Sequence, residues 1–117
     1  MSEALDVLVF TVPRDDTQAV LQALFEVGAG QVGNYDQCAF VTPGTGQFRP
    51  TPGADPSIGE VGELTYVPED RVELTFPGTI RARVVAALRE AHPYEVPAFH
   101  VLRNVADEPQ DDTATGG

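Results

Sequence analysis

The residues with the most chemical character in this chain form the cluster His92-Pro93-Tyr94-Glu95. An imidazole and a carboxylate three positions apart are both ligands that divalent metal ions accept. His92 also stands where a helix is expected to end, and an imidazole interacts favourably with the negative end of a helix dipole. Because Pro93 breaks the helix, helical spacing does not fix how His92 and Glu95 lie relative to each other. The cluster fits a structural cap, which we favour, and also a ligand or metal contact.

Two further residues could complete a metal site, Cys38 and His100. His100 alternates with apolar residues on the last expected strand, where a hydrogen-bonded or interface histidine is the commoner interpretation. A lone cysteine usually behaves as a small buried hydrophobic residue. A copper or zinc site that joined Cys38 to His92 or His100 would need these residues to meet in the fold. The single cysteine excludes an internal disulfide framework and a CxxC motif.

No nucleophile is paired with a base in the sequence, so a non-catalytic protein is expected. The acidic pair Glu69-Asp70 is interpreted as solvated loop charge, and the three tyrosines as core or interface aromatics. The run from Gly28 to Gly33 matches GxGxxG, but a dinucleotide fingerprint follows a strand and opens a helix. Here the motif follows an expected helix and enters an extended segment. A helix C-cap and a tight turn explain these glycines better.

Composition narrows the classes of function. The chain has 117 residues, 18 acidic and seven basic residues, and a formal net charge of −11; every basic residue is arginine. Nucleic acids and anionic membranes both require a basic surface, so neither is an expected partner. No apolar run reaches the length of a membrane span, and the N-terminus lacks a basic signal-peptide region. The expected compartment is the cytoplasm.

The hydrophobic pattern predicts one α+β domain over residues 1–106, followed by a disordered acidic tail over 107–117. The expected order begins with a strand at 5–12, a helix opened by Pro13 and an extended segment at 31–42, followed by a hairpin turn at 43–46, a short strand at 47–50 and a loop at 51–62. Strand-like segments near 63–67 and 71–76 then form two strands or one bent strand. A helix capped by Thr79 and stopped by Pro93 leads to a last strand at 99–105. This order is that of a ferredoxin-like βαββαβ sandwich with an extra hairpin.

Two helices can cover only one face of such a sheet. The first strand, LDVLVFTV, is nevertheless apolar on both faces, with Leu5, Val7 and Val9 on one and Leu8 and Phe10 on the other. A bare second face would expose a large apolar patch. We therefore expect that face to be buried against another subunit.

Several segments resemble a known family. The strings GAGQVGNYDQCAF, GTGQFRPTPGADPSIGEVG, EDRVELTFP and AHPYEVPAFHVL are similar to the inserted domain of the YqfO branch of the Nif-three-like proteins. The resemblance runs from about Leu5 to Leu102, and it identifies the chain as a stand-alone form of that domain. The inserted domain is in turn similar to the PII signalling proteins and to CutA, which implies a ferredoxin-like fold that tends to form trimers.

The resemblance also implies where a ligand would lie, because ligands and metals in such trimers occupy clefts between subunits. The matching positions are Gly44, Gly46, Phe48, Pro50, Gly53, Ala54, Pro56, Gly59, Gly62 and the segment His92–Glu95. The glycines permit close approach to another group, for which a neighbouring subunit is favoured over a ligand. The metal-ligand residues of the larger family domain are not in this sequence, so its dinuclear hydrolase site does not carry over.

The resulting expectation is a non-catalytic, trimer-forming module that binds a small ligand or metal ion at a subunit cleft. One alternative is a dedicated divalent-metal-binding protein that uses His92 and Glu95, with Cys38 and His100 as further candidates. A lesser alternative is a metal-dependent hydrolase. The cofactor is undetermined beyond a divalent metal ion as a candidate, and an unidentified protein partner is a further candidate.

Overall fold

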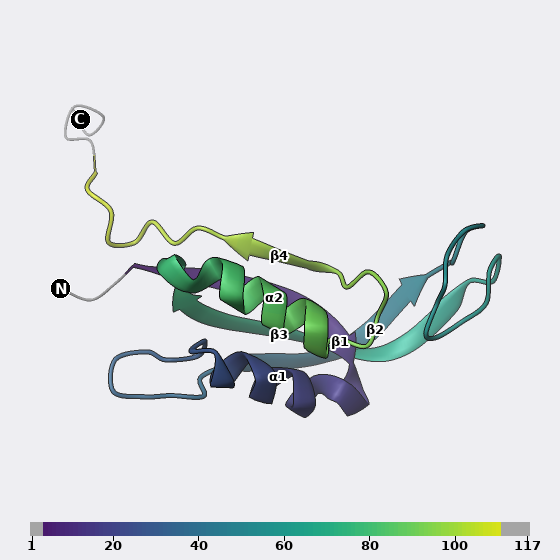
Figure 1. Cartoon of the computed structure of the whole chain (residues 1–117), viewed down its shortest axis with the longest axis horizontal. Coiled ribbons are helices and arrows are strands. Elements are labelled where there is room, and N and C mark those ends of the chain that lie inside the picture. Colours follow the sequence, from purple (N-terminus) through teal and green to yellow (C-terminus); the bar gives the residue numbers. More distant parts are fainter. Residues whose placement is uncertain (1–3, 111–117) are drawn as a thin grey trace.

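The computed structural model describes residues 4–110 (Figure 1). Its elements are β1 (Leu5–Pro13), a 3₁₀ turn (Arg14–Asp16), α1 (Thr17–Glu26), β2 (Phe40–Phe48), β3 (Thr65–Pro77), a second 3₁₀ turn (Gly78–Ile80), α2 (Arg81–Ala91) and β4 (Phe99–Leu102). The four strands form one sheet in the order β2-β3-β1-β4, and every neighbouring pair is antiparallel. This is the ferredoxin-like α+β fold that the sequence predicted.

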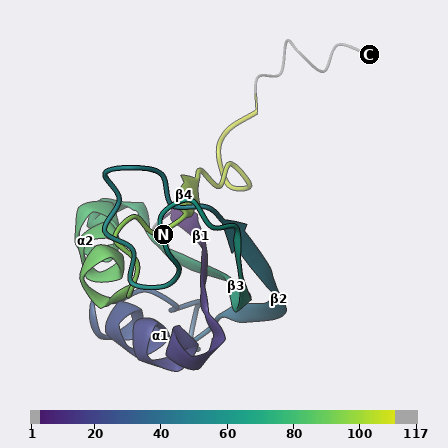
Figure 2. The same ribbon diagram turned by 90° about the vertical axis from the view of Figure 1, so that its right-hand side faces the viewer.

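The core lies between the sheet and both helices, which cover the same face (Figure 2). Alternate residues of a strand point to opposite faces, so Leu8, Phe10 and Val12 of β1 point toward the helices together. These three side chains are at most 1% exposed. The helices complete the core with Val20, Leu21 and Leu24 of α1 and Val84 and Leu88 of α2.

The end of α1 shows why the GxGxxG run is structural. Gly28 donates its N–H to the carbonyl of Phe25, and Ala29 donates to Leu24, which is the hydrogen-bond pattern of a Schellman cap. Gly28 has a φ of +106°, and Gly30, at +87°, donates to the carbonyl of Thr75 on β3. The motif therefore ends a helix and fixes the following loop to the sheet.

Three local expectations were wrong. The hairpin turn placed at Pro43–Gly46 does not form, because these residues pair one to one with β3 inside the continuous strand β2. Pro43 is tolerated there because β2 is an edge strand, where a missing N–H breaks no ladder. The extended segment at 31–42 becomes strand only from Phe40, and Thr79 lies inside the 3₁₀ turn, so Ile80 is the N-cap of α2. The segments near 63–67 and 71–76, for which two strands or one bent strand were both expected, form one strand, β3.

Among residues 4–110, no helix covers the opposite face of the sheet, here called the open face. The strand register places residues of the open face in three rows that run across neighbouring strands. The first row holds Thr42, Arg71 and Thr11. The second holds Phe40, Glu73, Val9 and His100, and the third holds Thr75, Val7 and Leu102. Arg71 and Glu73 form an ion pair at 2.9 Å on this face. The open face therefore mixes apolar and charged side chains.

Of the acidic tail expected over residues 107–117, the structure describes residues 107–110. Glu108 accepts a hydrogen bond from Arg103 Nε at 2.8 Å, and its N–H reaches the carbonyl of Val105. Residues 111–117 of that tail lie outside the described residues. Within residues 4–110, no helix is both long enough and apolar enough to cross a membrane.

Candidate functional site

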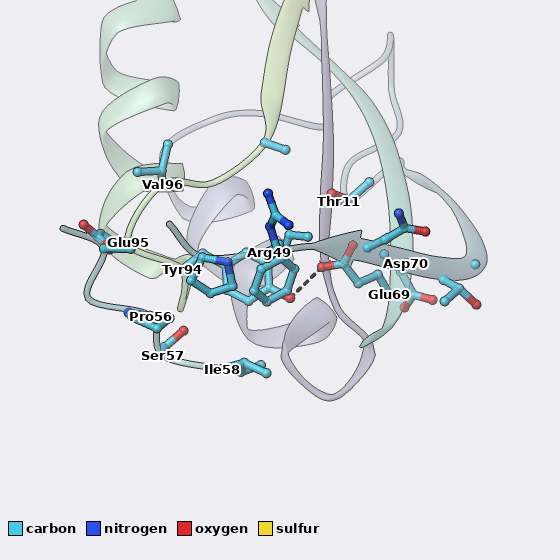
Figure 3. Close-up of a pocket in the computed structure, with 18 of the residues that line it drawn as sticks. Thr11, Arg49, Pro56, Ser57, Ile58, Glu69, Asp70, Tyr94, Glu95 and Val96 are labelled. Carbon is cyan, nitrogen blue, oxygen red and sulfur yellow. Dashed lines mark hydrogen bonds between the residues drawn. The ribbon is translucent and has the colours of Figure 1, made fainter. Parts of the chain in front are cut away.

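A pocket of about 610 Å³ opens at the end of the sheet where β2 and β3 extend beyond the helices (Figure 3). Three chain segments enclose it: the second half of β2 and its continuation, the loop that follows, and the connection from α2 to β4. The lining residues are Gly44–Pro50, Ala54, Pro56, Ser57, Ile58, Tyr94, Glu95, Val96 and Ala98, with Thr11 and Glu69–Arg71 from β1 and β3. A cavity of this size suits a small organic molecule.

A hydrogen bond between Tyr94 and Glu69 crosses the pocket. The Tyr94 hydroxyl donates to Glu69 Oε2 at 2.6 Å, and the tyrosine ring packs against Phe48 with ring centroids 5.9 Å apart. Burial raises the pKa of Tyr94 well above its usual value, and the hydrogen bond to Glu69 raises it further. Tyr94 is therefore a neutral hydrogen-bond donor, and it links the α2–β4 connection to β3.

The acidic pair Glu69-Asp70 is not solvated loop charge, contrary to the expectation. Both residues lie inside β3 and are only 7% exposed. Asp70 accepts a hydrogen bond from Thr17 Oγ1 at 2.6 Å, and Arg14 Nε lies 3.4 Å from its other carboxylate oxygen. Buried carboxylates require such partners. Asp70 thus fixes the start of α1 to β3, while Glu69 faces the pocket.

Gly46 is required because the Glu69 side chain lies directly over it. A Cβ built on Gly46 would be 1.9 Å from Glu69 Oε1. At Gly59, which has a φ of +86°, a Cβ would lie 2.7 Å from Thr65 Oγ1. Within one copy, the group closest to each of these two glycines is therefore a side chain of the same chain.

The other glycines of the predicted set behave differently. Gly53 and Gly62 have φ values of +100° and +87° with open space around them, so they serve the backbone path of the loop. Gly44 lies in β2, and its carbonyl accepts a hydrogen bond from Arg14 Nη2 at 3.1 Å.

Glu95 holds the loop that forms one wall of the pocket. Its Oε2 accepts a hydrogen bond from the backbone N–H of Asp55 at 2.8 Å. The partners are 40 positions apart in sequence, so the contact joins the β2–β3 loop to the connection after α2. The two segments that carry the family resemblance therefore meet at this pocket.

His92 uses both ring nitrogens within the fold. Nε2 lies 2.7 Å from the carbonyl of Thr11, and Nδ1 accepts the N–H of Tyr94 at 3.1 Å. The Thr11 carbonyl can only accept, so Nε2 carries the proton and the imidazole is the neutral tautomer. His92 is the C-cap residue of α2, but its ring bonds to β1 rather than to the helix end. It positions Tyr94.

The other candidate metal ligands are separated from His92. His100 lies on the open face opposite Val9, whereas the His92 ring packs edge-on against Phe10 on the helix-covered face. Cys38 lies in the loop before β2, where its Sγ is 3.6 Å from the carbonyl of Asp36. Within residues 4–110, no three His, Cys, Asp or Glu side chains gather as they would around a metal ion. One copy of the described chain does not assemble a metal site from these residues.

Sequence reasoning did not select Thr11, Arg49, Glu69 or Asp70, all of which line the pocket. The alternation of Val72, Leu74 and Phe76 predicted the second half of β3, but Pro68 and the adjacent charges hid the first half, which contains Glu69 and Asp70. Of the aromatic residues expected in the core or at an interface, Tyr35 and Tyr66 are 76% and 61% exposed in one copy and so lie outside its core.

The comparisons with known proteins agree with the fold and the motifs. The chain is 52% identical over 98 residues to a "GTP cyclohydrolase 1 type 2 homolog" of Mycobacterium tuberculosis, and 42% identical over 100 residues to the Bacillus subtilis protein of that name. These matches cover 84% and 86% of this chain but 26% and 27% of the relatives. The chain spans about a quarter of their length. No family model matches the chain.

Solved structures give the same result. A Bacillus cereus protein related to NIF3 aligns with a TM-score of 0.75 and 36% identity, over 89% of this chain and 26% of that one. The divalent ion tolerance protein CutA1 from Ehrlichia chaffeensis aligns with a TM-score of 0.65 and 16% identity, over 97% and 91% of the two chains. The second likeness concerns the fold alone. The resemblance to the Nif-three-like proteins and to CutA is confirmed.

Proposed function

Because this chain is homologous to one segment of the Nif-three-like proteins, we propose that it is a non-catalytic, trimer-forming module that binds a small ligand at a subunit cleft. The observation that carries the proposal is the position of the pocket. Its lining includes Thr11 and Arg71, which belong to the open face, so pocket and open face are continuous. A second copy packed on the open face would border the pocket and turn it into a cleft between subunits.

The polar groups of the pocket support binding rather than catalysis. Glu69 is hydrogen-bonded to Tyr94, Asp70 to Thr17, and Glu95 to the Asp55 backbone. Each of these acids already makes a contact that joins parts of the fold. The name of the larger relatives mentions a cyclohydrolase, but this chain matches only a quarter of them. The hydrolase alternative has no supporting observation in the described residues.

The resemblance to PII and CutA and the open face support trimer formation. A divalent metal ion as the ligand remains the alternative, through His92 and Glu95. His92 would have to give up the hydrogen bond to Thr11 or to Tyr94 before it could coordinate a metal. A small organic molecule in the pocket needs no such rearrangement and is the preferred ligand class.

Native mass spectrometry of untagged protein purified without chelator tests the proposal. The expected spectrum shows a trimer with a defined extra mass per subunit, and that mass identifies the ligand class. A trimer whose extra mass is a metal ion, retained in a Tyr94→Ala variant but lost in His92→Ala, would favour the metal alternative. A monomer at micromolar concentration would contradict the subunit cleft.

A further inference from the structure

The charged residues of the pocket are unequally partnered. Five of them line it: Arg49, Glu69, Asp70, Arg71 and Glu95. The three acids accept the hydrogen bonds described above, and Arg71 is paired with Glu73 at 2.9 Å. Arg49 makes no hydrogen bond or ion pair with any residue that the structure describes. It is the one charged group of this pocket without a partner in residues 4–110.

Arg49 also has a favourable position. It follows directly after β2, it is exposed, and in the view of Figure 3 its guanidinium lies between Val96 and Thr11. Arg81, Arg83 and Arg89 also form no ion pair with a described acid, but they lie on α2, and only Arg49 of these four lines the pocket. A guanidinium offers several N–H donors in a planar fork that fits a carboxylate or a similar anion. Arg49 is therefore suited to pair with a negative group.

The rest of the lining restricts the ligand further. The walls are largely apolar, with Phe48, Pro50, Ile58, Val96 and the ring of Tyr94. An apolar body would fill this space and displace water. A second negative charge would find no unpaired cation in the pocket and would be repelled by Glu69, Asp70 and Glu95. Polyphosphates are thereby disfavoured.

We propose that the pocket binds a monoanion with an apolar body, with Arg49 paired to its carboxylate or equivalent acidic group. This inference rests on the proposed function, because it assigns the ligand class of the same pocket. The overall charge of −11 does not prevent such binding, since exposed charges beyond about 8 Å are largely screened at physiological salt. Arg49 is exposed, so its contact with the ligand acts at short range and should weaken as salt is added.

A pair of fluorescent probes tests the charge requirement. Anilinonaphthalene sulfonate is a monoanion with an apolar body, and phenylnaphthylamine has the same body without the sulfonate. The Arg49→Gln variant should weaken sulfonate binding by at least about tenfold, because it removes a charge-assisted contact. Binding of the neutral probe should change by less than about twofold. The control Arg83→Gln, on the exposed side of α2, loses the same charge and should change neither affinity.

The location of the probe must be established, because such dyes also bind exposed apolar surfaces. The chain has no tryptophan, so single reporters can be introduced. Val96→Trp places an indole at the pocket, and its emission should be quenched by bound sulfonate. Tyr35→Trp lies in the loop before β2, at the other end of the molecule, and should be quenched much less (Figure 1).

The outcomes separate this inference from the proposed function. If neither probe quenches the Val96→Trp reporter, the pocket binds no small molecule of this kind and the proposed function fails with the inference. If both probes bind there and Arg49→Gln leaves the sulfonate affinity unchanged, only the inference fails. Dissociation of the oligomer by Arg49→Gln, measured by sedimentation, would show an interface arginine and overturn the inference. Displacement of the sulfonate by tripolyphosphate at equal concentration would overturn the monoanion assignment.

Discussion

Tyr94 and Glu69 form a pair in which each residue depends on the other. The carboxylate is 7% exposed, and the tyrosine hydroxyl donates to it at 2.6 Å. A buried carboxylate without a donor costs free energy, and hydrogen bonds to charged groups contribute about 1.5–3 kcal/mol. The pair therefore stabilises the wall of the pocket as well as the contact between β3 and the connection after α2.

The raised pKa of Tyr94 predicts how stability changes with pH. Above pH 10.0, the ordinary pKa of a tyrosine, the unfolded chain loses the tyrosine proton while the folded chain, in which the pKa of Tyr94 is raised, keeps it. The folded state then binds more protons than the unfolded state, so the free energy of unfolding falls as pH rises. Below pH 10 the contribution is fully present. Urea denaturation from pH 8 to 11 should show this decline in the wild type and a shallower one in Tyr94→Phe.

The Tyr94→Phe variant should also lower the free energy of unfolding at pH 8 by about 1–3 kcal/mol, because Glu69 loses its hydrogen-bond donor. Tyr35→Phe is the control, since Tyr35 is 76% exposed and should change stability by less than about 0.5 kcal/mol. Adding Glu69→Gln to Tyr94→Phe should recover part of the loss. Equal pH slopes for wild type and Tyr94→Phe would contradict the assignment of the raised pKa.

Individual residues were the hardest level to predict from the sequence. Glu69-Asp70 looked like solvated charge because two adjacent acids usually are. The pair is buried because β3 runs through it, which sends one carboxylate to Thr17 and the other to Tyr94. Gly46 was expected to lie close to a neighbouring subunit or a ligand, and within one copy the group that lies close to it is Glu69, 23 positions later in the chain. No local pattern encodes such a partner.

The elements with clear periodicity were predicted well, and the irregular ones were not. β1, α1, α2 and β4 all occur near their predicted positions, because their apolar residues repeat with strand or helix spacing. β2 has no such repeat: its sequence FVTPGTGQF is almost wholly exposed, and Pro and Gly usually mark turns. It forms a strand because β3 offers nine consecutive pairing positions. Tertiary pairing here overrides local propensity.

The loop after β2 is long, and the hydrogen bond from Asp55 N–H to Glu95 is a specific tether for it. Glu95→Ala removes the acceptor and should release the loop locally. Native-state hydrogen exchange should show faster exchange of the Asp55 amide and its neighbours by roughly tenfold, since about 1.4 kcal/mol is lost. Protection of the core strands β1 and β3 should not change.

Glu60→Ala is the matched control for this tether. Glu60 lies in the same loop and is exposed, and its side chain has no hydrogen-bond or ion-pair partner among residues 4–110. Its substitution by alanine removes the same charge as Glu95→Ala. It should leave the exchange rate of Asp55 unchanged. If Glu95→Ala and Glu60→Ala accelerate exchange equally, the effect comes from charge and the tether does not order the loop.

For the whole molecule, the open face is the surface that the two helices leave uncovered. It is less apolar than β1 alone suggested, because β3 contributes Arg71, Glu73 and Thr75. Val9 is already 4% exposed within one copy, so neighbouring side chains shield it. The exposed apolar residues of this face are Phe40 and Leu102, on the two edge strands. An interface of mixed polarity, with apolar contributions from the edges, fits this pattern.

This arrangement predicts that one substitution on the open face separates assembly from folding. Leu102 is 49% exposed in a single copy, so Leu102→Glu should change the stability of the monomer by less than about 0.5 kcal/mol. In the assembly the same carboxylate would be buried without a partner, which is strongly unfavourable. Sedimentation should therefore show a trimer for the wild type and monomer for the variant. Val105→Glu, which is 60% exposed but lies beyond β4, should remain trimeric. A Leu102→Glu trimer as stable to dilution as the wild type would show that subunits meet through another surface, and the pocket would then lie outside any cleft between them.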